Sequence, residues 1–101
     1  MRVLALILLA GCASQSYAIK SHRADVEMCY SMGLQRRADL AGQVVVELEV
    51  GAGGHVQTAR IVSSTLADGE VEACIAEAAA RWDFPGRAPG RLTVPFVLGG
   101  E

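Results

Sequence analysis

Two glutamates on one predicted strand are the first residues whose types and spacing suggest chemistry. Glu47 and Glu49 lie two positions apart in a strictly alternating segment, so both carboxylates project from one face, about 6–7 Å apart by strand rise. Acid–base catalysis by such a pair needs an apolar enclosure around one of the carboxyl groups. The sequence shows no such enclosure, and we interpret the pair as part of a solvated strand face.

The histidines and hydroxyl residues do not make up a catalytic set either. His22 lies in a polar segment before the first predicted helix, and His55 lies in a predicted turn; we interpret each as a solvated residue. Ser63, Ser64 and Thr65 follow a predicted strand and lead toward a helix, which is typical of turn and capping residues rather than nucleophiles. We therefore expect no enzyme, no cofactor and no metal site.

Cys12 stands at the end of an N-terminal apolar stretch. Arg2 precedes the apolar run 3–10, and small residues lead into the cysteine, as in a bacterial secretory signal. The sequence Leu-Ala-Gly-Cys at residues 9–12 resembles the lipobox of bacterial lipoproteins, whose cysteine thiol receives a diacylglyceryl group before the preceding peptide is removed. The resemblance implies a signal peptide over residues 1–11 and lipidation of Cys12. The alternative is an ordinary signal peptide with an incidental cysteine.

A lipid on Cys12 would place the protein in the cell envelope, anchored to a membrane and facing the periplasm. The run 3–10 is too short to span a bilayer, which takes about 20 apolar residues. Residues 12–22 then form a lipidated tether whose last ten residues reach about 35 Å at most, so the domain at 23–101 lies close to its membrane. Ala13, in place of an aspartate after the cysteine, favours the outer membrane under the commonest sorting rule.

Lipidation of Cys12 leaves one even pair, Cys29 and Cys74. In a small exported domain such a pair predicts a disulfide. Closing this loop would stabilise the fold by up to about 4 kcal/mol in the chain-entropy model. Two free buried thiols and half of a metal site are the alternatives, but no histidine lies at ligand spacing from either cysteine.

Composition limits the size of the core and the kind of partner. The chain has 101 residues, enough for one small domain. Without Arg2, eight basic residues face eleven acidic ones, and the arginines form no cluster. We therefore expect no nucleic-acid binding and no adhesion to anionic lipid beyond the anchor.

The pattern of apolar residues predicts the element order α-β-β-α-β. Apolar residues at three- and four-residue spacing predict a helix over 23–35, and strict alternation predicts a strand over 42–50. Residues 51–54 are a glycine-rich turn, and 55–63 form the returning strand, whose imperfect alternation indicates a bulge. Asp68 is the expected N-cap of a second helix that runs through Trp82. Residues 92–98 form a final strand, and Pro95 favours an edge position for it.

Several of these motifs together resemble the C-terminal domain of TonB-type proteins. They are the strand 42–50, the segment 56–64, the strand 92–96 and, most specifically, Arg-Trp-Asp-Phe-Pro-Gly at residues 81–86. The cysteine pair narrows the resemblance to the AgmX/PglI C-terminal domain family. The resemblance implies an α+β fold in which two helices cover one face of a three-stranded antiparallel sheet, with Trp82 and Phe84 as core anchors.

The resemblance also implies a protein-interaction role without catalysis, within an envelope assembly for transport or gliding motility. TonB domains bind receptor peptides along the terminal strand, which corresponds here to residues 92–98. The expected binding residues are Leu92, Thr93, Val94, Phe96 and Val97. Pairing with another copy of the chain and docking through the wetted sheet face are alternatives. A different hypothesis is a small periplasmic inhibitor or accessory lipoprotein that presents a loop, either 51–54 or 87–90.

Overall fold

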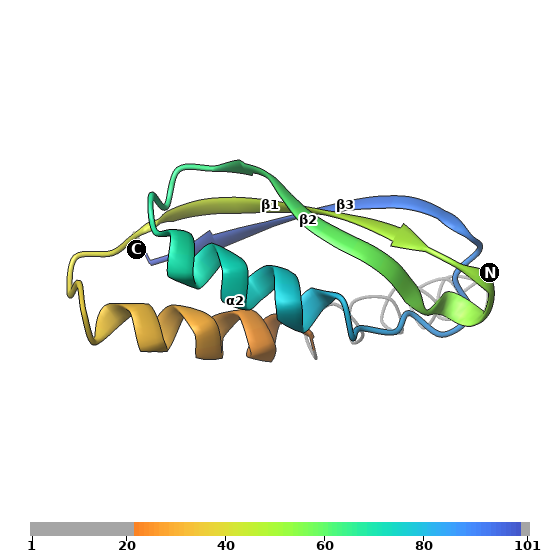
Figure 1. Cartoon of the computed structure of the whole chain (residues 1–101), viewed down its shortest axis with the longest axis horizontal. Helices are drawn as coiled ribbons and strands as arrows, with labels where there is room; N and C mark the ends of the chain where they lie inside the picture. The colour runs from red at the N-terminus through yellow and green to blue at the C-terminus, as the bar shows by residue number, and fades with distance from the viewer. Residues whose placement is uncertain (1–21, 100–101) are drawn as a thin grey trace, which may run out of the picture.

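The computed structural model describes residues 22–99, which form a two-layer α+β fold. A three-stranded antiparallel sheet makes one layer, and two helices pack side by side against one of its faces (Figure 1). The other face of the sheet is uncovered by any described element. The predicted signal peptide, Cys12 and tether residues 12–21 lie outside the described residues.

The sheet has the strand order β2-β1-β3, so β1 is central and β3 is an edge strand, as Pro95 predicts. β1 spans Gly42–Val50, β2 spans Val56–Ser64 and β3 spans Gly90–Leu98. In β1 every second side chain from Val44 to Val50 is buried, which matches the alternation in the sequence. β3 pairs with β1 along its whole length without a register shift.

The β1–β2 pairing is irregular at two places. Register shifts between Val45 and Val46 and between Glu49 and Val50 mark bulges in β2, where the sequence predicts one. The connection between the strands contains a short 3-10 helix, η1 (Ala52–Gly54), in which Gly53 and Gly54 have φ values of 79° and 85°. The glycines at 53 and 54 therefore allow a left-handed turn that other residues would strain.

The first helix covers residues 22–34, and α2 spans Gly69–Ala79. The Asp68 side chain accepts a hydrogen bond from Val71 N–H and caps α2 as expected. Contrary to the expectation, α2 does not run through Trp82. The Trp82 carbonyl accepts a hydrogen bond from Val56 N–H (3.1 Å), so the chain leaves the helical path at this point to join β2.

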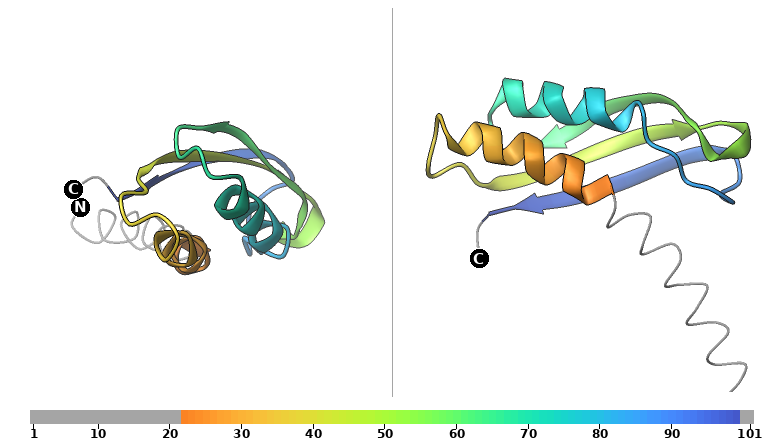
Figure 2. Two further views of the ribbon diagram at one scale, coloured as in Figure 1. Left: turned by 60° about the vertical axis from the view of Figure 1, so that its left-hand side comes forward. Right: turned by 90° about the horizontal axis from the view of Figure 1, so that it is seen from below.

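The two helices lie over one face of the sheet (Figure 2), and the core side chains fill the space between these layers. Trp82 and Phe84 are 3% and 6% exposed, and their two rings stand edge-on to each other. Cys29 in the first helix and Cys74 in α2 form a disulfide that joins the two helices. Phe96 is the largest fully buried side chain, and the next largest are aliphatic: Leu40, Leu48, Leu66, Ile75 and Leu98.

Candidate functional site

The side chains of the predicted binding strand divide between the two faces of the sheet. Thr93 and Val97 are exposed on the uncovered face, and Leu92 is half-buried. Val94 and Phe96 are only 8% and 2% exposed and point into the core. The expectation that Val94 and Phe96 contact a partner is therefore wrong for their side chains, because successive residues of a strand point to opposite faces.

The backbone N–H and carbonyl groups of β3 likewise point alternately toward β1 and toward the free edge. Gln43 in β1 directs its backbone toward the β2 side, because its N–H donates to Thr65 Oγ1 (2.9 Å) and its carbonyl accepts from Thr65 N–H (2.8 Å). Gln43 is paired with Val97 across the β1–β3 ladder, so this is a pair without exchanged hydrogen bonds. The N–H and carbonyl of Val97 therefore point away from β1.

The same direction repeats at every second residue of β3. Because the β1–β3 register has no shift, Pro95, Thr93 and Arg91 also direct their backbone groups to the free edge. Arg91 and Thr93 each present an N–H donor and a carbonyl acceptor there. Within residues 22–99 these groups have no hydrogen-bond partner. This stretch of β3 can therefore accept an added strand.

Two residues limit the free edge at its C-terminal half. Pro95 presents a carbonyl but has no N–H to donate. Arg23 in the first helix donates from Nη2 to the Val97 carbonyl (2.9 Å) and from Nε to Glu27 (3.1 Å). Sequence reasoning missed Arg23, because no local pattern shows that its long side chain reaches a carbonyl 74 residues away.

Ion pairs run across the uncovered face of the sheet. Glu47 in β1 pairs with Arg60 of β2 (2.9 Å) and lies 3.8 Å from Arg91 of β3, which also pairs with Glu49 (3.1 Å). The hydrogen bond to Glu49, followed by the charge of Glu47, raises the pKa of Arg91. The two glutamates thus connect neighbouring strands through arginines, and the arrangement does not resemble an acid–base pair.

His22 is not a solvated tether residue, which corrects the expectation. Its ring stacks on Trp82 at a centroid distance of 4.8 Å, and its Nε2 is hydrogen-bonded to the Asp83 carbonyl (2.7 Å). The residue lies within the first helix, whose packing brings it over the aromatic cluster. His55 is exposed, as predicted for a turn residue, and its Nδ1 pairs with the Asp83 carboxylate.

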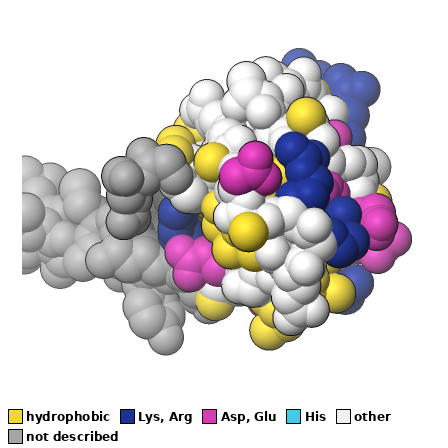
Figure 3. Space-filling view, turned by 90° about the vertical axis from the view of Figure 1, so that its left-hand side faces the viewer, with side chains coloured by type: hydrophobic (Ala, Val, Ile, Leu, Met, Phe, Trp, Pro, Cys, Tyr) yellow, Lys and Arg dark blue, Asp and Glu magenta, His cyan; other side chains and the backbone are white. Residues whose placement is uncertain are grey.

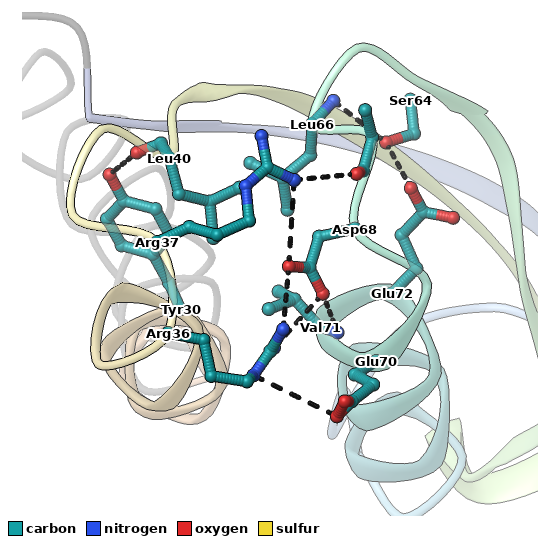
Figure 4. A network of polar contacts seen from close by, with 11 residues as sticks. Tyr30, Arg36, Arg37, Leu40, Ser64, Leu66, Asp68, Glu70, Val71 and Glu72 are labelled. Atoms are coloured by element: carbon teal, nitrogen blue, oxygen red, sulfur yellow. Dashed lines mark hydrogen bonds and ion pairs between the residues drawn. The ribbon is translucent and has the colours of Figure 1, made fainter.

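A polar network joins the ends of the two helices (Figure 4). Arg36 donates through both terminal nitrogens to the Asp68 carboxylate, 3.1 Å each, and Arg37 donates to the Ala67 carbonyl (2.9 Å). The hydrogen bond from Arg36, followed by that from Val71 N–H, lowers the pKa of Asp68. Figure 3 shows this end of the molecule, where basic and acidic side chains lie together among hydrophobic ones. We assign the network to stability, since its groups satisfy one another.

Two further observations concern residues 22–99. No group of three or more His, Cys, Asp or Glu side chains in this range is placed to hold a metal ion. No helix in the same range is long and apolar enough to cross a membrane.

In comparisons with known proteins, no protein-family model, no curated protein and no solved structure matches the chain.

Proposed function

We propose that this chain is a lipid-anchored envelope protein that binds an extended segment of another envelope protein along the free edge of β3. The role is binding without catalysis. The observation that carries the proposal is the row of outward backbone groups at Arg91, Thr93 and Pro95 on an edge strand. An extended segment paired there adds a fourth strand to the sheet, in the manner of β-augmentation.

The energy of such binding comes mainly from the backbone. Each new hydrogen bond contributes about 0.5–1.5 kcal/mol net, so the few bonds along 91–95 support a transient rather than a permanent contact. The exposed Thr93 side chain, next to Glu47 across the ladder, is the nearest side chain that can select the partner's sequence. A transient edge contact suits a protein that docks on and leaves an envelope assembly.

The anchor and the family belong to the same proposal. In this proposal a lipid on Cys12 holds the domain at the periplasmic side of the outer membrane. Labelling of the cells with a radioactive fatty acid tests the lipidation. The two helices on one face of a three-stranded antiparallel sheet agree with a TonB-like C-terminal domain of the AgmX/PglI type, working in transport or gliding motility. The α+β architecture and the sequence motifs at residues 81–86 and 92–96 both support this assignment.

In-cell photo-crosslinking tests the proposal directly. A photoreactive residue at Thr93 in the full-length protein should capture an envelope protein, whereas the same residue at Thr58, exposed on the other edge strand, should not. Capture at Ala88 in the 87–90 loop, without capture at 93, would instead identify a loop-presenting inhibitor. Capture of only a second copy at Thr93 would replace the hetero-partner with a homodimer.

A further inference from the structure

The free edge of β3 can pair with an added strand over only part of its length. Thr93 and Arg91 offer both a donor and an acceptor to an added strand, but Pro95 offers only its carbonyl. Two residues further on, the Val97 carbonyl already accepts a hydrogen bond from the Arg23 guanidinium (2.9 Å). The hydrogen-bonding capacity of the edge therefore falls at Pro95, and at Val97 the carbonyl acceptor is already occupied.

We propose that Pro95 and Arg23 together stop an added strand at the residue that faces Pro95, so that the partner binds with a short extended segment opposite 91–95. This inference rests on the proposed function and names what limits its binding segment. The partner chain turns away from the edge before it reaches Val97. Arg23 limits the length of the bound segment in this arrangement, because a longer strand has to displace its guanidinium from the Val97 carbonyl.

The position of Arg23 supports a role beyond a surface ion pair. Its side chain is 40% exposed and bonds to Glu27 one helical turn away, which orients the guanidinium across the gap to β3. Arg23 lines an open groove of about 560 Å³ between the first helix and β3, together with Tyr30, Leu34 and Val97 among others. Because Arg23 holds the Val97 carbonyl, Val97 stays outside the paired segment, and its side chain remains 59% exposed.

An edge limited in this way also protects the protein. A long free edge pairs readily with any exposed strand, and a proline or an inserted charge shortens it. β2 on the opposite side carries two bulges, which disturb pairing by a different means. The stretch of β3 at 91–93 is thus the part of the edge that is regular and offers both donors and acceptors.

The test compares two crosslinking positions on the same strand. Thr93 and Val97 both expose their side chains on the uncovered face. With the photoreactive residue in the lipoprotein in living cells, we expect capture of the partner at 93 and little or none at 97. In the double variant Arg23→Ala/Pro95→Val, capture at 97 should rise toward the level at 93. An Arg81→Ala variant, which changes another exposed arginine, should leave the ratio unchanged.

The possible outcomes separate the two proposals. Equal capture at 93 and 97 in the unsubstituted protein overturns the stop but keeps the edge as a binding site. An unchanged ratio in the double variant, with its disulfide formed and its circular dichroism native, also overturns the stop. A misfolded double variant is replaced by Arg23→Gln alone, for which a raised 97-to-93 ratio is again required. Capture at neither position overturns the proposed function and the stop with it.

Discussion

The backbone of Gly54 lies directly against the backbone of Phe84. The Phe84 N–H donates to the Gly54 carbonyl over 2.7 Å, and a Cβ on Gly54 would lie 2.2 Å from the Phe84 carbonyl oxygen. The contact fixes the β1–β2 connection against the chain that leaves α2. It explains why this end of the sheet holds Phe84 in the core.

The close approach predicts a large difference between two glycine substitutions. Gly54→Ala should lower the free energy of unfolding by at least about 2 kcal/mol, because backbone must move as well as adopt a strained φ. Gly86 has a similar φ of 82° but open space where a Cβ would stand, so Gly86→Ala should cost only about 1 kcal/mol. Urea unfolding of both variants measures the difference, and equal losses would show that the Gly54–Phe84 contact is not tight.

Removal of the disulfide should weaken the fold without changing its topology. Cys29→Ser/Cys74→Ser is expected to lower the free energy of unfolding by about 2–4 kcal/mol, since the reduced chain gains conformational freedom when unfolded. Reduced wild-type protein is the matched control and should unfold at the same urea concentration as the double variant. An unreduced native sample that reacts with a thiol-alkylating reagent at both cysteines would contradict the pairing.

Asp68 should make the stability of the protein depend on acid pH. Its pKa is lowered in the folded state below the ordinary 3.8, mainly by the hydrogen bond from Arg36, so its stabilising effect is full above that ordinary value and is lost as pH falls through the folded value. Asp68→Asn keeps the N-cap but removes the charge. The melting temperature of this variant should therefore lie below that of the wild type at neutral pH and approach it in acid.

Glu70 provides the control for Asp68. Its side chain is 72% exposed and lies 3.8 Å from the same arginine, so Glu70→Gln should change the melting temperature little at any pH. Thermal melts by circular dichroism at several pH values measure both variants. A constant gap between the wild type and Asp68→Asn across the acid range would contradict the role of the Asp68 charge.

The indole of Trp82 should be coupled energetically to Asp25. Its Nε1 donates to Asp25 Oδ2 over 2.9 Å, between residues 57 positions apart. A double-mutant cycle with Trp82→Phe and Asp25→Ala should give an interaction energy of about 1 kcal/mol, the usual contribution of a partly exposed hydrogen bond. The same cycle with Glu27→Ala, whose carboxylate pairs with Arg23 instead, should give no coupling beyond error.

Local patterns predicted β1 and β3 well because every second side chain of these strands is buried over most of their length. The alternation in 42–50 shows which side chains of β1 are buried, and Pro95 marks β3 as an edge, since a proline cannot donate within a central strand. The same alternation shows that Val94, Phe96 and Leu98 share the buried face of β3. The alternation alone therefore predicts that the Phe96 side chain is buried and does not contact a partner.

The contacts of His22 and Arg23 were not predictable in the same way. His22 is hydrogen-bonded to a carbonyl 61 residues away, and the hydrogen bond from Arg23 to the Val97 carbonyl spans an even longer separation. Periodicity identifies the buried face of a helix, but it does not tell which distant carbonyl a flexible polar side chain at the helix margin will reach. Such contacts follow from how the first helix is placed over β3 and the aromatic cluster.

The cross-link between Cys29 and Cys74 also decides how the domain carries a mechanical load. Tension between the start of the first helix and a protein held on β3 runs along residues 22–29, crosses the sulfur atoms, and continues through 74–99. The segment 30–73, which contains β1 and β2, lies in the bypassed loop and carries no tension through its own covalent chain. Load reaches the central strand β1 only through its hydrogen bonds with β3 and its packing, not along its own covalent chain.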